Sequence, residues 1–253
     1  MNASQIAKWS RHQLSWSIRI AGRKAREAQK FIASNRYKPL LRVLLITNLV
    51  SVFLFILRLI GAENFRYWFM VWNLALAWVA PLIALWLVTR LRTRPWKHWS
   101  NIFLTVLWLG FLPNSFYMVS DLIHVESTGE ISIIFDAVLF TSFIFNGFIA
   151  GYIGTYLIHR ELLRRVSVRR AYLYISGIFV LASYAIYLGR ALRWNTWDAF
   201  LQPAGLLFDI SDSILNPVAH PQAWVITGSY TLLIGVFYLL AFELLRALRS
   251  DHR

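Results

Sequence analysis

The chain has 253 residues, of which 58% are hydrophobic and only 15% are charged, and its formal net charge is +14. This composition excludes an ordinary soluble globular domain, because a soluble domain of this size needs a more polar surface. The lack of cysteine in the sequence excludes a disulfide framework, a thiolate nucleophile and a thiolate metal site.

The N-terminal region, residues 1–39, is predicted to be a basic leader. At about 100° per residue, one helical face carries the basic side chains and the other the apolar ones. The basic face holds Lys8, Arg11, Arg19, Arg23, Arg26 and Lys30, and the apolar face holds Ile6, Trp9, Trp16, Ile20 and Phe31. This pattern predicts an amphipathic helix on the anionic cytoplasmic leaflet. A disordered leader that only enforces the membrane topology is the alternative.

Six apolar segments follow, each long enough to cross a bilayer as a helix of about 20 residues. They are residues 40–60, 67–89, 99–119, 131–158, 171–192 and 223–248. Each is predicted to be helical, because hydrocarbon offers the backbone no other hydrogen-bond partner. The predicted fold class is therefore all-α: a polytopic membrane bundle of six transmembrane helices, in one domain spanning residues 40–250.

The basic residues predict the orientation of this bundle. All but four of the 26 lysines and arginines lie in the first 42 residues, in the links after the second and fourth segments, or near the C-terminus; the exceptions are Arg58, Arg66, Arg190 and Arg193. The positive-inside rule therefore predicts that both termini are cytoplasmic. Membrane insertion explains this distribution better than nucleic-acid binding does, so no nucleic-acid partner is expected.

The third segment ends in "FLPNSFYMVSDLIH", in which Pro113 is predicted to end the helix near the outer interface. On a helix, Asn114, Tyr117, Asp121 and His124 share an arc of about 80°. Any one of them could be an interfacial anchor or part of a water-facing helix end. Together they predict one wall of a polar, outward-facing pocket.

The fourth segment places Asp136 inside an apolar stretch, where a carboxylate needs a partner. Arg190 or Arg193 is the expected partner, and Asp136 is expected to form another wall of the pocket. Three small residues predict close packing against a neighbouring helix: Gly147, Gly151 and Gly154. At the cytoplasmic end of the segment, His159 and Glu161 are expected to be solvated.

The fifth segment emerges on the same outer side with "LGRALRWNTWD". Its two arginines defy the positive-inside bias, so carboxylates or a bound anion are expected beside them. Trp194 and Trp197 alone would suit an interfacial aromatic belt. The predicted ligand-binding residues are Asn114, Tyr117, Asp136, Arg190, Arg193, Trp194, Asn195, Trp197 and Asp198.

The next link, residues 198–222, is the longest external one, and a short interfacial helix is expected in it over the outer mouth. Asp209, Asp212 and His220 are of the right type to bind zinc or manganese together with Asp121 and His124. Their spacing supports no metal site, so no metal ligand is assigned, and no motif identifies a cofactor.

Three elements carry a resemblance to a known family: Leu-Pro-Asn, Tyr-x-x-x-Asp-x-x-His and Arg-Trp-Asn-x-Trp-Asp. Together with "FDAVLFTSFIFNG" they resemble the domain of unknown function 1361 family over residues 40–248. The resemblance implies a multi-pass protein of the bacterial plasma membrane, and it brings no activity with it.

Three functions are compatible with these residues. The first is binding of an anionic or sugar-bearing ligand in the outward-facing pocket, as part of an envelope assembly. The second is a membrane-embedded hydrolase or transferase at the outer leaflet, with His124 as general acid or base and Asp121 as its orienting partner. The third, a transporter, is disfavoured because few ionisable groups continue toward the cytoplasm. The predicted partners are the lipid bilayer and, through the leader, its anionic cytoplasmic leaflet.

Overall fold

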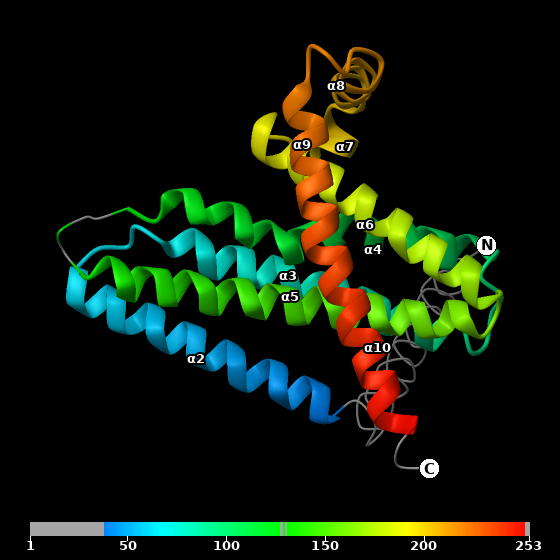
Figure 1. Cartoon of the computed structure of the whole chain (residues 1–253), viewed down its shortest axis with the longest axis horizontal. Helices are drawn as coiled ribbons and strands as arrows, with labels where there is room; N and C mark the ends of the chain where they lie inside the picture. Colours follow the sequence, from blue (N-terminus) through cyan, green and yellow to red (C-terminus); the bar gives the residue numbers. More distant parts are fainter. Residues whose placement is uncertain (1–37, 127–128, 130, 251–253) are drawn as a thin grey trace, which may run out of the picture. The chain divides into compact units, whose positions relative to one another are not determined.

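The computed structural model describes residues 38–126, 129 and 131–250, so the predicted amphipathic leader lies outside the described residues. The described residues form helices and no strand. Six of the helical segments are long and apolar enough to cross a membrane, which confirms the predicted all-α class (Figure 1). The chain divides after Leu45, and every contact described below lies within residues 46–253.

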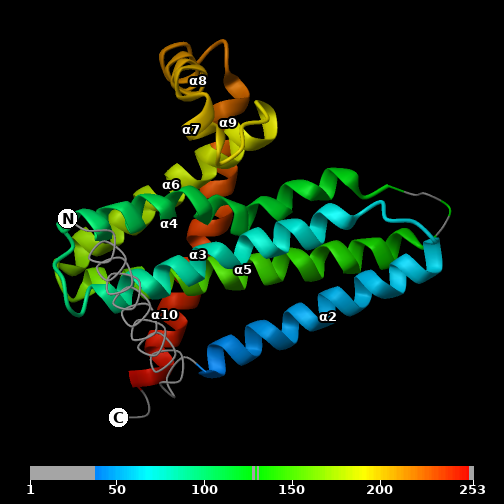
Figure 2. The same cartoon turned by 180° about the vertical axis from the view of Figure 1, so that it is seen from behind.

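The helices follow the predicted segments closely. In chain order they are α2 (Lys38–Ala62), α3 (Trp68–Arg90), α4 (Trp99–Tyr117), a 3-10 helix η1 (Met118–His124), α5 (Ile133–Leu163), α6 (Val168–Ala191), α7 (Asp198–Leu201), α8 (Pro203–Leu215), α9 (Pro221–Tyr230), a π-helical stretch η2 (Thr231–Val236) and α10 (Phe237–Ser250). The last span is continuous through α9, η2 and α10. Both views show α7 and α8 gathered where α6 ends and α9 begins (Figures 1 and 2).

Pro113 does not end the third span, contrary to the prediction. It lies inside α4, is buried, and is followed by helix as far as Tyr117, after which the chain tightens into η1. Proline is tolerated inside membrane helices where the surrounding protein compensates for the backbone groups that it disturbs. The break in regular α-helix therefore comes one turn later than the sequence predicts.

The core of the bundle lies where α3, α4 and α5 run side by side (Figure 2). Trp108 of α4 and Phe140 and Phe143 of α5 are completely buried there. The predicted close packing of the α5 glycines is present: a side chain at Gly151 would meet Phe116 of α4, and one at Gly154 would meet the backbone of Pro81 in α3. Small residues allow the helix backbones to approach in this way.

Large apolar side chains also cover the outside of the helices. Leu49, Phe145, Leu173, Val225 and Leu240 are each more than 60% exposed within the protein. In a soluble protein such a surface would aggregate, whereas hydrocarbon solvates it. The outer surface therefore supports a lipid bilayer as the environment of the six spans.

A buried amide network joins α2 to α5 inside the hydrophobic region. The side-chain amide of Asn146 donates to the Ser51 hydroxyl (2.7 Å), and its carbonyl oxygen accepts from Asn48 (3.2 Å). Trp78 of α3 donates to the Asn48 carbonyl oxygen (3.0 Å). Such hydrogen bonds hold membrane helices together, so we assign this network to packing.

The orientation of the bundle can be tested directly. We expect reporters fused after Arg94 and Arg169 to be in the cytoplasm, and reporters fused after Glu126 and Gln202 to be outside, because of the distribution of basic residues. Each site should be fused separately to a reporter that is active only inside the cytoplasm and to one that is active only outside it. Exchange of the two pairs would contradict the predicted topology.

Candidate functional site

Arg190, at the end of α6, is the centre of a polar cluster. Its Nη2 lies 3.6 Å from Oδ1 of Asp121 and 3.4 Å from Nε2 of His124, and it also donates to the Ser120 carbonyl. Its guanidinium carbon lies 5.5 Å from the centre of the Tyr117 ring. We call Tyr117, Ser120, Asp121, His124 and Arg190 the Arg190 cluster. Residues from two distant parts of the sequence thus meet as the polar stripe predicts.

The geometry of η1 explains why the stripe stays on one face. A 3-10 helix has three residues per turn, so side chains three apart are aligned along its axis. Asp121 and His124 are three apart and belong to η1, and Tyr117 immediately precedes it. Three residues of the predicted face, Tyr117, Asp121 and His124, therefore meet at Arg190, whereas Asn114 contacts Thr196.

Asp121 is the buried member of the cluster, with 2% of its side chain exposed. Nδ2 of Asn73, in α3, donates to its Oδ2 at 2.8 Å. Among the described residues, Asp121 has no hydrogen bond to His124. Asn73 and Arg190, rather than His124, therefore satisfy the carboxylate. The sequence analysis did not identify Asn73 as a member of this site. The feature that could have identified it is a single side-chain amide within an otherwise apolar span.

His124 is the exposed member of the cluster. Its ring lies edge-on to Phe69, with 5.3 Å between ring centres, and its backbone carbonyl accepts from the Tyr67 hydroxyl (3.3 Å). If Nδ1 carries the proton, Nε2 can accept from Arg190. The imidazole is therefore positioned by an arginine and an aromatic ring.

Asp136 lies in a different buried centre. Its Oδ1 is 3.1 Å from Nε of Arg58, and each side chain is 1% exposed. The Arg58 guanidinium lies 4.2 Å from the centre of the Tyr67 ring, and Nη1 donates to Asn64 (2.8 Å). The expected pairing of Asp136 with Arg190 or Arg193 is wrong, because α2 brings Arg58 alongside α5. Arg58 was visible in the sequence as an arginine on the predicted outer side.

The turn after α6 carries Arg193, which is exposed and has a positive φ of 60°. This left-handed conformation is uncommon for a residue other than glycine. Within residues 38–126, 129 and 131–250, no carboxylate lies at ion-pair distance from Arg193. Its charge is therefore presented at the surface next to Trp194.

The other predicted ligand-binding residues of this turn have structural contacts. Nε1 of Trp194 donates to Asp209 of α8 (2.8 Å), and the backbone N–H of Asn195 donates to Asp198 (2.6 Å). The Asn114 amide is 3.4 Å from the Thr196 hydroxyl. Trp197 is 44% exposed and lies edge-on to Phe111. The turn thus contacts α4 and α8. The side chains of Arg193 and Trp197 remain exposed at the surface.

On the extramembrane link, Asp212 pairs with His220, with 2.7 Å between Oδ2 and Nε2. Hydrogen bonds from Asn216 and then His220 hold the pKa of Asp212 below its usual value. In the part of the chain that the structure describes, no three histidine, aspartate or glutamate side chains form a group that could hold a metal ion.

His159 and Glu161 lie at the C-terminal end of α5, the end away from Asp136. Both are buried, contrary to the expectation that they are solvated. Nδ1 of His159 is 3.0 Å from the Tyr238 hydroxyl, and its ring stacks on Phe242 of α10. Glu161 forms an ion pair with Arg165. The packing of α10 on this end, which the sequence does not reveal, removes His159 from solvent.

The Arg190 cluster predicts a contrast between two variants. Arg190→Ala should lower the free energy of unfolding by about 2 kcal/mol, because it removes the cation that is paired with the buried carboxylate of Asp121. The cost stays below that of a fully buried pair because Arg190 is partly exposed. His124→Ala should change it by less than about 0.5 kcal/mol, because His124 is exposed. Thermal unfolding in detergent measures both. Equal losses would mark His124 as part of the packing.

Comparison with known families gives a match over most of the chain. The model of a family described as "Protein of unknown function (DUF1361)" matches residues 72–237. The matched range contains Asn73, all of the Arg190 cluster and the turn after α6. No curated protein and no solved structure matches the chain. The match confirms the resemblance that the three sequence elements indicated.

Proposed function

The chain belongs to the DUF1361 family, whose description states no activity, and we propose from the geometry that it binds an anionic or sugar-bearing ligand. The site would be the Arg190 cluster together with Arg193 and Trp197. By the predicted topology it faces the outside of the bacterial plasma membrane, where the protein would serve an envelope assembly.

Unsatisfied cationic donors carry this proposal. Asp121 balances the charge of Arg190, but the buried Nε of Arg190 has no hydrogen-bond partner among the described residues. Arg193 adds a second charge that no described carboxylate meets. Guanidinium groups bind carboxylates and phosphates through parallel hydrogen bonds, and the partly exposed Arg190 and the exposed Arg193 are the donors that an anionic ligand would meet.

The neighbouring side chains suit a sugar or another polar ligand. His124 offers a ring nitrogen at the surface, and Trp197 offers a large exposed ring. An aromatic ring supplies apolar contact area while the polar groups around it fix the ligand's orientation. This combination supports an anionic sugar derivative more strongly than a simple inorganic anion.

Binding is favoured over catalysis and over transport by two observations. The acid–base mechanism assigns Asp121 as the partner that orients His124, whereas Asp121 accepts a hydrogen bond from Asn73 and has none to His124 among the described residues. A transport path would need polar groups through the centre of the bundle, whereas Trp108, Phe116, Phe140 and Phe143 are fully buried there. The enzyme and the transporter therefore rank below the binding protein.

Ligand-induced stabilisation in detergent tests this function. A ligand that binds the native state raises the unfolding temperature in proportion to its affinity and concentration. We expect glucuronate and glucose 6-phosphate to raise it and glucose to have little effect. Arg193→Gln should abolish the shift without lowering the stability of the unliganded protein, because Arg193 is exposed.

Arg66→Gln is the matched control, since Arg66 is an exposed arginine at the same end of the bundle, paired with Glu126. It removes the same charge and should keep the ligand shift. Equal loss of the shift in both variants would indicate nonspecific attraction, and no shift with either anionic probe would refute the proposed ligand class.

A further inference from the structure

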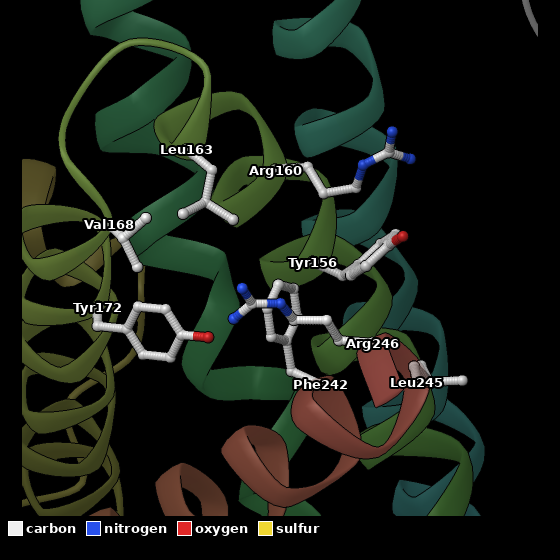
Figure 3. Close-up of a pocket in the computed structure, with 8 residues that line it drawn as sticks. All are labelled: Tyr156, Arg160, Leu163, Val168, Tyr172, Phe242, Leu245 and Arg246. Carbon is white, nitrogen blue, oxygen red and sulfur yellow. The ribbon is translucent and has the colours of Figure 1, made fainter. Parts of the chain in front are cut away.

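A second polar region lies at the other end of α6, in a cavity of about 390 Å³ among α5, α6 and α10. Its walls include Tyr156 and Arg160 from α5, Val168 and Tyr172 from α6, and Phe242 and Arg246 from α10 (Figure 3). We call it the Arg160–Arg246 pocket. The volume falls within the range of small-ligand sites, and it would hold a headgroup rather than a whole lipid.

The floor of the pocket is aromatic. Phe242 is 9% exposed, and its ring stacks on the buried ring of His159 with 4.3 Å between ring centres. Tyr172 lies edge-on to the same histidine at 4.9 Å. Three rings from α5, α6 and α10 therefore contact one another at the base of the pocket.

The mouth of the pocket carries more positive than negative charge. Arg246 lies 3.6 Å from Glu243, and Glu243 also accepts a hydrogen bond from Tyr172. Arg160 lies 5.6 Å from the centre of the Tyr156 ring, and no described carboxylate is at ion-pair distance from it. The residues around the mouth thus include two guanidinium groups and one carboxylate. In Figure 3 the Arg246 guanidinium points toward Tyr172, and that of Arg160 lies on the Tyr156 side.

The position of the pocket indicates what occupies it. It lies where α5 turns into α6 and where the last span ends, and this end of the bundle is predicted to be cytoplasmic. Such a site at the edge of the hydrocarbon meets lipid headgroups, and basic pockets between membrane helices on the cytoplasmic side bind anionic ones.

We propose that the Arg160–Arg246 pocket binds the phosphate group of an anionic lipid headgroup. The arginines would hold the phosphate, and Val168 and Phe242 would contact the glycerol carbons. Planar guanidinium groups suit phosphate oxygens, and the adjacent apolar wall suits the less polar part of a headgroup. This site is independent of the Arg190 cluster, since the two lie at opposite ends of α6.

Binding of short-chain phosphatidylglycerol to the full chain in detergent tests the proposal. We expect saturable binding, with little binding of short-chain phosphatidylcholine. The double variant Arg160→Gln/Arg246→Gln should weaken the affinity at least about tenfold, the effect of losing a charge-assisted hydrogen bond. Val168→Trp keeps the charge but should fill the cavity, and it should weaken binding similarly.

The matched control is Arg169→Gln/Arg170→Gln, which removes the same charge from two exposed arginines at the same end. The control should keep the wild-type affinity. Equal weakening in both double variants, or unchanged binding in the pocket variants, would overturn the proposal. Thermal unfolding without lipid checks that each variant is folded. If the double arginine variant does not fold, Val168→Trp still tests whether lipid binding depends on the cavity. Inorganic phosphate is a second probe, which distinguishes a lipid headgroup from free phosphate. If the pocket binds inorganic phosphate but not the lipid, the assignment to lipid is overturned.

Discussion

Replacing Arg58 by alanine is expected to lower the free energy of unfolding by about 3–5 kcal/mol, the cost of leaving a buried charge without its partner. Asp136 would lose its ion-pair partner in a site where only 1% of its side chain is exposed. Asn64 would also lose the hydrogen bond that it accepts from Arg58. The measurement is thermal unfolding in detergent, together with the amount of protein recovered from the membrane.

The control for Arg58→Ala is the double variant Arg58→Met/Asp136→Leu. Apolar residues of similar size often replace a buried ion pair without loss of stability, because neither charge then has to be desolvated. We expect the double variant to be clearly more stable than Arg58→Ala. Wild-type stability of Arg58→Ala would contradict the buried pair, and a double variant as unstable as the single one would mean that the site needs polar groups.

Gly147→Ala should destabilise the protein by about 3 kcal/mol or more, at the upper end of the range for overpacked sites. A Cβ at Gly147 would lie 2.3 Å from the Ser115 carbonyl oxygen and 2.5 Å from the terminal carbon of Met118. Met118 could rotate away, but the carbonyl belongs to the backbone of α4. Relief of the contact therefore requires α4 and α5 to separate, which opens the core.

Gly177→Ala is the matched control for Gly147→Ala. Gly177 lies inside α6, and a Cβ there would meet nothing within 4 Å. Alanine is a better helix former than glycine by about 0.5–1 kcal/mol, so this substitution should be neutral or slightly stabilising. Unfolding temperatures in the same detergent compare the two variants. Equal values would show that close approach at Gly147 does not limit the packing of α4 on α5.

The Arg190 cluster shows which parts of the site can be predicted from residue patterns in the sequence. The polar stripe after Pro113 and the two outer arginines predict a polar centre, and Tyr117, Asp121, His124 and Arg190 do meet. The same reasoning assigned Asp136 to that centre, although its partner is Arg58 on α2. Periodicity identifies which side chains share a face of one helix, but not which helix that face meets.

The sequence by itself determined the class of the protein: six helical spans, their approximate ends, and the family. Burial of an apolar segment in lipid is a sum over its own residues, so it can be read along the chain. Only the tertiary structure decided which charges pair, that His159 is buried, and that a cavity lies between Arg160 and Arg246. These properties depend on distances between helices that are far apart in sequence. Because hydrocarbon solvates all apolar helix faces alike, the hydropathy of a face does not indicate whether it packs against another helix or contacts lipid.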